Sequence, residues 1–180
     1  MKTRQHLSNG CSVAKETLGL YSDMQNLNRA AIKYVEETIK AGMGLWDIKS
    51  LCEEYLLNNG ADSFWYWDVG AFIFAGEETA VSVSGKDYQV ADRIVQKNDI
   101  ITVDLSPQKN CIWGDYARTL VFEDGVLCHE ISRIKKDEWR NGLKMEEYLH
   151  NTLMEMAAPD MTFGELYNYM NELIVKKGFL

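Results

Sequence analysis

The sequence has little proline and no excess of basic residues, and both shortages limit what the chain can be. Only two of its 180 residues are proline and no tract is of low complexity, which argues against a disordered chain. Lys and Arg number 19 against 27 Asp and Glu, so the net charge is −8. A nucleic-acid partner needs a basic surface and is not expected. Hydrophobic residues make up 46% of the chain, which is enough for a core.

Long apolar runs and closely paired cysteines are also missing. No run reaches the roughly 18 apolar residues of a membrane-spanning helix, so no membrane partner is expected. The basic N-terminus leads into Ser8-Asn9-Gly10 rather than into the apolar core of a secretory signal. Thiols in a reducing compartment are the simplest interpretation of the cysteines, and one disulfide is the alternative. We therefore expect a cytoplasmic protein. The four cysteines are Cys11, Cys52, Cys111 and Cys128.

Two stretches of the sequence repeat the same pattern of two amphipathic helices. Apolar spacing predicts a helix from Leu27 to near Lys40, a break at Gly42 and Gly44, and a second helix that stops at Gly60. The same apolar phase, break and glycine stop return at a constant offset of 118 residues. Any two amphipathic helix pairs share some likeness, but the three matches together favour a duplication. A duplicated pair implies a pseudo-twofold domain in which helices back a sheet.

Aromatic and β-branched segments between the two helix pairs predict strands. These segments are residues 64–67, 71–74, 100–104 and 117–122. Turn signals at residues 97–99 and 123–125 border the last two segments. The predicted fold class is therefore α+β.

Two aspartates at neighbouring strand ends are the residues best placed for chemistry. Asp104 ends an apolar strand and Asp115 begins the next, so a hairpin can bring their carboxylates side by side. Two close carboxylates repel unless a cation lies between them, and a divalent metal suits their oxygens. The alternative is that both are turn acids that cap backbone amides. Spacing alone favours that alternative, because such turns are common.

The residues around the two aspartates resemble a known metal-binding hairpin. Asp104-Leu-Ser-Pro and Gly114-Asp-Tyr-Ala-Arg-Thr are similar to the family that includes methionine aminopeptidase, Xaa-Pro dipeptidase, aminopeptidase P and creatinase. In that family the second aspartate comes eleven positions after the first, and Asp115 follows Asp104 at that spacing. The resemblance covers the chain from about Leu27 onward. It implies the pita-bread fold, in which pseudo-twofold helix pairs back a curved antiparallel sheet.

The resemblance implies a site for two divalent metal ions, held by two Asp, one His and two Glu. Asp104 and Asp115 match the two aspartates, and Arg118 and Thr119 would lie behind them and orient the carboxylates. Manganese, cobalt, iron or zinc would be bound. The implied activity is the hydrolysis of short peptides by an exopeptidase or dipeptidase, with a small peptide as the partner. A homodimer is compatible with the resemblance.

The sequence departs from the family pattern in two places. Family members carry a His in a loop upstream of the first Asp, whereas no His lies between Trp65 and Asp104. Ser82 or Ser84 in that loop is a weak candidate for contact with a peptide. The His and both Glu ligands would follow Gly178 in this register. We therefore expect residues 1–180 to form one incomplete pita-bread domain that binds metal weakly and is inactive alone. The alternative is a non-catalytic pita-bread domain that binds a peptide or a protein.

Overall fold

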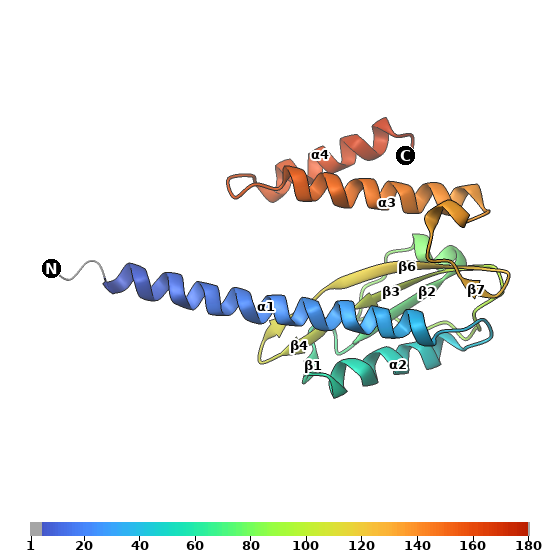
Figure 1. The fold of residues 1–180 in the computed structure, drawn as a ribbon, viewed down its shortest axis with the longest axis horizontal. Helices are drawn as coiled ribbons and strands as arrows, with labels where there is room; N and C mark the ends of the chain where they lie inside the picture. Colours follow the sequence, from blue (N-terminus) through green and yellow to red (C-terminus); the bar gives the residue numbers. More distant parts are fainter. Residues whose placement is uncertain (1–4, 180) are drawn as a thin grey trace. The chain divides into compact units, whose positions relative to one another are not determined.

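A computed structural model describes the backbone of residues 5–179 and the side chains of residues 15–179. The chain divides into two compact units, one that runs up to His129 and one that begins at Glu130 (Figure 1). Helices and antiparallel sheets are both present, so the predicted α+β class is confirmed. The single domain that we expected over residues 1–180 stays a prediction. No described helix has the length and apolar character needed to cross a membrane.

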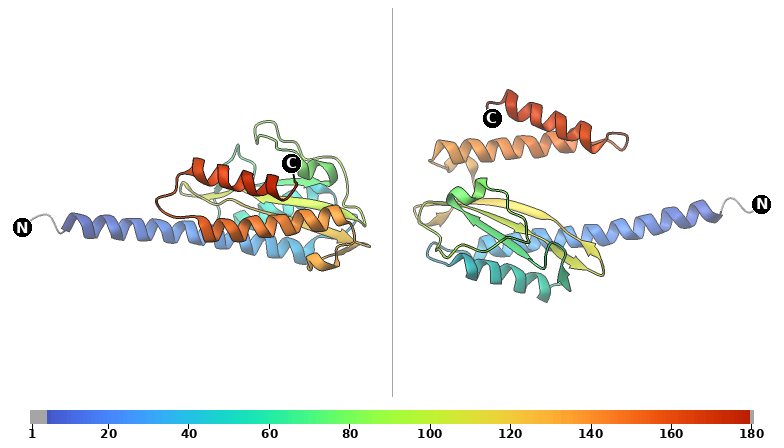
Figure 2. Two further views of the ribbon diagram at one scale, coloured as in Figure 1. Left: turned by 90° about the horizontal axis from the view of Figure 1, so that it is seen from above. Right: turned by 180° about the vertical axis from the view of Figure 1, so that it is seen from behind.

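The first unit begins with two helices that cover one face of a sheet (Figure 2). Helix α1 (Gln5–Thr38) is longer than the predicted helix, and α2 (Leu45–Asn58) matches the prediction closely. Gly42 lies between them with φ of 94°, a left-handed conformation that favours glycine. Helix α2 buries four residues at helical spacing against the core: Leu45, Ile48, Cys52 and Leu56.

The main sheet has four antiparallel strands in the order β2-β3-β6-β7. Their bounds are Ala71–Ala75, Asp99–Leu105, Tyr116–Glu123 and Val126–Leu127. A smaller sheet has the order β1-β4-β5, with bounds Ser63–Phe64, Pro107–Lys109 and Ile112–Trp113. Two short 3₁₀ helices complete the elements outside the α-helices, η1 (Gly76–Ala80) and η2 (Ile131–Arg133).

The strand predictions hold for the main sheet and fail at residues 64–67. β2, β3 and β6 extend the predicted segments by one or two residues. Strand β1 stops at Phe64, however, and Trp67 and Asp68 turn the chain with φ of 57° and 56°. Aromatic residues favour strands, but here a tight turn with two left-handed residues ends the strand.

The central strand β3 separates the core from the opposite face of the sheet. Successive side chains of a strand point to opposite faces, and β3 follows this alternation along its whole length. Ile101, Val103 and Leu105 are fully buried against the helices, whereas Thr102 and Asp104 are partly exposed on the other face. The face that carries Asp104 is therefore the one that α1 and α2 leave uncovered.

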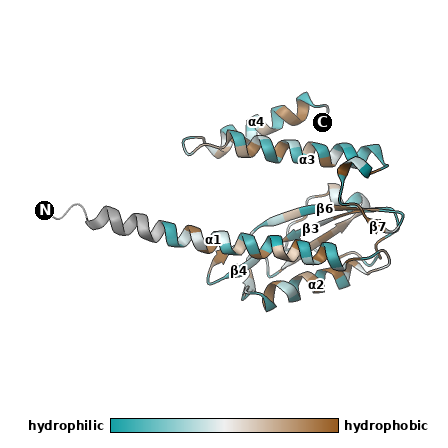
Figure 3. Cartoon of the chain, in the orientation of Figure 1, coloured by the Kyte–Doolittle hydropathy of each residue, from teal (hydrophilic) through white to brown (hydrophobic). Residues whose placement is uncertain are grey.

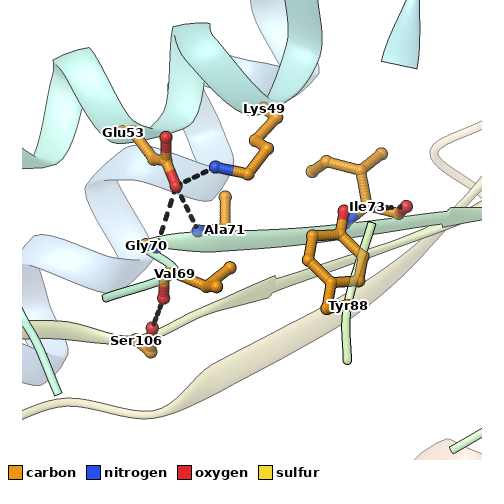
Figure 4. Close-up of polar contacts among 8 residues, drawn as sticks. All are labelled: Lys49, Glu53, Val69, Gly70, Ala71, Ile73, Tyr88 and Ser106. Carbon is orange, nitrogen blue, oxygen red and sulfur yellow. Dashed lines mark hydrogen bonds and ion pairs between the residues drawn. The ribbon is translucent and has the colours of Figure 1, made fainter. Parts of the chain in front are cut away.

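A carboxylate on α2 anchors the start of β2 (Figure 4). Glu53 accepts hydrogen bonds from the backbone N–H of Gly70 at 2.8 Å and of Ala71 at 3.3 Å, and it forms an ion pair with Lys49. The backbone groups at this strand end would otherwise be buried without a partner. Glu53 thus fixes the register of the sheet edge against α2.

Tyr88 and Ser106 hold the same edge from the other side (Figure 4). The Tyr88 hydroxyl accepts a hydrogen bond from the N–H of Ile73 at 2.8 Å and lies 3.3 Å from its carbonyl. Burial raises the pKa of Tyr88 to about 12, so the hydroxyl stays protonated. The Ser106 hydroxyl donates to the carbonyl of Val69. The two contacts of Tyr88 satisfy backbone groups of edge strand β2 that no further described strand pairs, and the Ser106 contact holds the chain just before β2.

The second unit repeats the helix pair at the predicted offset. Helix α3 (Asp137–Met156) ends 118 residues after α1, and α4 (Phe163–Lys176) begins and ends 118 residues after α2. Gly60 and Gly178, which follow α2 and α4, both have positive φ, of 133° and 79°. A capping box of Thr162 and Glu165 begins α4. The duplication inferred from the sequence is therefore confirmed at the level of single residues.

The apolar side of α4 is only partly covered. Apolar and polar residues alternate along α3 and α4 (Figure 3), and no residue of α4 is fully buried. Leu166, Met170, Leu173 and Ile174, the apolar residues of this side, all have intermediate burial.

Candidate metal centre

Asp104 and Asp115 lie on the same face of the main sheet. Asp104 is paired with Ala117 in the ladder between β3 and β6. Asp115 lies two residues before Ala117, and side chains two residues apart in extended chain point the same way. The ten residues between the two aspartates do not form a simple loop but the separate hairpin of β4 and β5. This hairpin folds away into the small sheet and leaves the two carboxylates as neighbours.

The surroundings of the pair disfavour two negative charges. Burial, together with the smaller effect of the negative charge of Asp115, raises the pKa of Asp104 to about 6, and a backbone hydrogen bond from Leu105 opposes the shift. Desolvation also raises the pKa of Asp115. Because repulsion between the carboxylates is mutual, ionising one makes the other harder to ionise. A positive charge between the two carboxylates would therefore stabilise their ionised forms.

A divalent cation fits this pair of donors. Carboxylate oxygens are the ligands that manganese and other hard or borderline ions accept, and a cation between them removes the repulsion. The described residues offer no group of three or more His, Cys, Asp and Glu side chains that could hold a metal. Asp104 and Asp115 therefore fit the two-aspartate part of a metal site, and the rest of a coordination shell needs other donors.

A cavity of about 360 Å³ opens beside Asp104. Most of its lining is aromatic or aliphatic, and Asp104, Thr102 and Ser82 are among the polar residues that line it. Ser82 thus lies where a molecule bound beside Asp104 could reach it, and its role in peptide binding stays a prediction. Ser84 is not one of the lining residues, and its carbonyl accepts a hydrogen bond from the N–H of Asp87 at 2.9 Å.

Thr119 and Arg118 lie on different faces of β6. Thr119 is paired with Thr102, and their hydroxyl oxygens are 3.4 Å apart on the face that carries Asp104. Arg118 points to the opposite face and donates a hydrogen bond to the carbonyl of Ala117 at 2.6 Å. Its guanidinium lies 3.9 Å from the centroid of the Tyr116 ring. In the described structure Arg118 therefore contacts neither carboxylate, and the orienting role that the resemblance implied stays a prediction.

Two contacts to the backbone around Asp115 were not predicted from the sequence. Gln25 on α1 donates a hydrogen bond to the carbonyl of Asp115, and the Trp65 indole donates one to the carbonyl of Gly114. Gln25 and Trp65 are 90 and 49 residues away from their partners, and no local pattern marks such pairs.

Comparison with protein families settles the relationship that the motif suggested. Residues 20–180 match the model of metallopeptidase family M24. The chain belongs to this family. Its members are peptidases that depend on divalent metal ions. No curated protein sequence matches the chain.

Solved structures of M24 enzymes share the fold. The chain superposes on the X-Pro aminopeptidase of Thermotoga maritima with a TM-score of 0.74 at 17% identity, covering 91% of this chain and 42% of that one. For the prolidase of Pyrococcus furiosus the TM-score is 0.75 at 20% identity, with 91% and 44% covered. For the Xaa-Pro dipeptidase of Bacillus anthracis it is 0.76 at 13% identity, with 91% and 41% covered. The fold is thus of the pita-bread type, and the chain spans less than half the length of these structures.

Proposed function

We propose that this M24 chain supplies the two-aspartate part of the metal site of an exopeptidase or dipeptidase that hydrolyses short peptides. The observation that supports the proposal is the shared face of Asp104 and Asp115 beside a cavity that Asp104 lines. Raised carboxylate pKa values at a cavity are a common mark of a functional site.

Different residues of this chain would bind the metal ion and the peptide. Asp104 and Asp115 would hold the cation, and a bound divalent ion polarises a peptide carbonyl and activates water. The apolar lining of the cavity would exclude water from one side of the peptide, and the Ser82 hydroxyl would hydrogen-bond its backbone. Manganese, cobalt, iron and zinc all suit these donors, and a cytoplasmic location agrees with the widely spaced cysteines.

The test is a titration of Mn²⁺ into the chain by calorimetry, with Asp104→Asn and Asp115→Asn as variants. Both substitutions keep the size of the side chain and remove its charge, so each is expected to weaken binding by at least tenfold. Asp68→Asn is the matched control, because Asp68 is an exposed aspartate in the turn after β1. Equal Mn²⁺ affinity in all four proteins would contradict the proposal.

A second candidate is a non-catalytic domain that binds a peptide. Two observations favour it: no third metal ligand joins the aspartates among the described residues, and the cavity lining is largely apolar. This candidate predicts peptide binding that is the same with Mn²⁺ and with a chelator. The peptidase proposal predicts that peptide affinity rises when Mn²⁺ is present. Fluorescence anisotropy of a labelled peptide under the two conditions separates them.

A further inference from the structure

The backbone of residues 114–115 is held by side chains from two distant parts of the chain. Strand β6 begins at Tyr116, so the ladder itself does not fix Asp115. The Trp65 indole Nε1 donates to the carbonyl of Gly114 at 2.8 Å. The Gln25 amide Nε2 on α1 donates to the carbonyl of Asp115 at 3.2 Å. Two consecutive carbonyls are therefore held at the position from which the Asp115 carboxylate leaves the backbone.

Gln25 is itself held by a buried neighbour on α1. The Asn28 Nδ2 donates to the Oε1 of Gln25 at 3.1 Å, and Asn28 is fully buried. The oxygen and the nitrogen of the Gln25 amide point in different directions. When Oε1 accepts the bond from Asn28, Nε2 is therefore directed at the carbonyl of Asp115. The bond to Gln25 satisfies the Nδ2 of Asn28, whereas its buried Oδ1 has no hydrogen-bond partner in the described structure. Asn28 thus fixes which way the Gln25 amide points.

Helix α1 approaches the backbone at Gly114 as closely as a glycine allows. A Cβ at Gly114 would lie 2.6 Å from the Asn28 Nδ2 and 2.9 Å from the Cγ of Met24. One turn before Met24 on α1, the Tyr21 ring forms a T-shaped contact with Trp113, and Trp113 packs against Trp65. The helix and the indole that hold the two carbonyls are therefore in contact through one aromatic cluster.

We propose that Gln25 is a positioning residue for the candidate metal centre: braced by Asn28, it sets the direction of the Asp115 carboxylate through the Asp115 backbone carbonyl. The inference rests on the proposed metal function. Metal ligands need placement to within about 0.5 Å, and groups that orient a ligand typically change metal affinity by about 10- to 100-fold when removed. Asp115 lacks the strand pairing that fixes Asp104, so it depends on Gln25 for this placement.

The experiment compares Mn²⁺ affinity in Gln25→Met and Asn26→Met, measured from the free-ion signal in electron paramagnetic resonance. At position 25 methionine keeps the length of the side chain and removes the donor, and at the exposed position 26 it introduces the same apolar side chain. Asn26 is the matched control, because it is the next residue of α1 and accepts a bond only from the exposed Arg29. We expect about a tenfold loss of affinity in Gln25→Met and none in Asn26→Met. Circular dichroism melts set a working temperature at which every variant is folded.

A double-mutant cycle separates positioning from a general structural effect. If Gln25 acts through Asp115, then Gln25→Met changes Mn²⁺ affinity in the wild type but has no further effect in Asp115→Asn. Equal losses in both backgrounds, or no loss in the wild type while Asp115→Asn binds more weakly, would overturn the inference and leave the proposed metal site intact. Unchanged affinity in Asp115→Asn alone would instead overturn the metal site itself.

Trp65→Phe offers a second route to the same answer. Phenylalanine keeps an aromatic ring in the cluster and removes the Nε1 donor to Gly114. Trp113→Phe is its control, because Trp113 packs in the same cluster and its indole is more exposed. Weaker Mn²⁺ binding in Trp65→Phe than in Trp113→Phe supports the positioning of residues 114–115, and equal binding in the two variants contradicts it.

Discussion

Asp104 on β3 stands beside the carboxylate of Asp115 on the face of the sheet that α1 and α2 leave uncovered, and the negative charge of Asp115 adds to the burial that raises the pKa of Asp104 to about 6. In the unfolded chain an aspartate has its ordinary pKa near 3.8. The folded state therefore binds a proton at Asp104 more tightly than the unfolded state does. Linkage then ties the stability of the metal-free fold to pH.

Asp104→Asn is expected to stabilise the metal-free chain at neutral pH. Between pH about 4 and 6 the folded chain carries more protons at Asp104 than the unfolded chain, so its contribution to the free energy of unfolding falls as pH rises through this range. After allowance for solvent screening, the gain at pH 7 is about 1–2 kcal/mol. Urea unfolding of wild type and variant at pH 4 and pH 7 measures it. If Asp104→Asn stabilises the chain as much at pH 4 as at pH 7, the charge of Asp104 is not the cause of the stabilisation.

Protons are expected to compete with metal at the same pair. A cation binds the ionised carboxylates, so its affinity depends on how fully Asp104 has lost its proton. Below the raised pKa of about 6, Mn²⁺ affinity falls by about tenfold per pH unit at most, and above pH 7 it levels off. Titrations at pH 5, 6, 7 and 8 measure the profile. In Asp104→Asn the remaining Mn²⁺ affinity should depend less steeply on pH, because the variant has no proton to lose at position 104. An unchanged pH dependence would count against Asp104 as a metal ligand.

Much of this fold could be predicted from the sequence, because it depends on local patterns. Helix α2 and its copy α4 follow from apolar spacing and a glycine stop, and the main strands follow from β-branched and aromatic runs. The Asp104–Asp115 pair was found through a motif within one segment of chain. The turn at Trp67 was missed because its aromatic residues also favour strands.

The support of the site could not be predicted in this way. The contact of Gln25 with the Asp115 carbonyl joins residues 90 apart, and it depends on where α1 crosses the sheet. The face of β6 on which Arg118 lies was not predicted from the motif. The motif places it three residues after Asp115, an odd number, and strand alternation then sends it to the opposite face. Sequence patterns identify the residues with the right chemistry, and tertiary packing decides which of them meet.

Glu53 is expected to be a main source of stability at the sheet edge. Its carboxylate accepts the N–H of Gly70 and Ala71 and pairs with Lys49, whose side chain is only 12% exposed. Glu53→Ala removes the acceptor of both N–H groups and the carboxylate opposite the ammonium, so we expect a loss of about 2–4 kcal/mol in the free energy of unfolding. Glu54→Ala, one residue along α2, is the control.

The ion pair and the backbone contacts of Glu53 can be separated. Glu53→Gln keeps an oxygen that can accept from Gly70 but removes the charge opposite Lys49. The double variant Lys49→Met, Glu53→Gln removes the ammonium as well. It is expected to be more stable than Glu53→Gln alone, because a largely buried ammonium without its carboxylate is worse than none. A double variant that is the less stable of the two would show that the Lys49 side chain stabilises this edge even without the charge of Glu53.

Gly114→Ala is expected to destabilise the first unit and to weaken metal binding together. An added Cβ at position 114 would lie 2.6 Å from the Asn28 Nδ2 and 2.9 Å from the Met24 side chain, so α1 or the β5–β6 connection must shift. Overpacking of this kind costs about 1–3 kcal/mol. Because the shift acts on the residue next to Asp115, Mn²⁺ affinity should fall even at temperatures where the variant is fully folded.

Gly19→Ala provides the comparison, because it adds the same methyl group to the same unit in open space. No atom lies within 4 Å of a Cβ at Gly19, which is an exposed position within α1. Alanine favours the helix over glycine by up to about 1 kcal/mol, so Gly19→Ala should raise the midpoint of thermal unfolding where Gly114→Ala lowers it. Its Mn²⁺ affinity should match that of the wild type. A Gly114→Ala variant that unfolds earlier yet binds Mn²⁺ as tightly as Gly19→Ala would show that α1 supports the fold without controlling the position of Asp115.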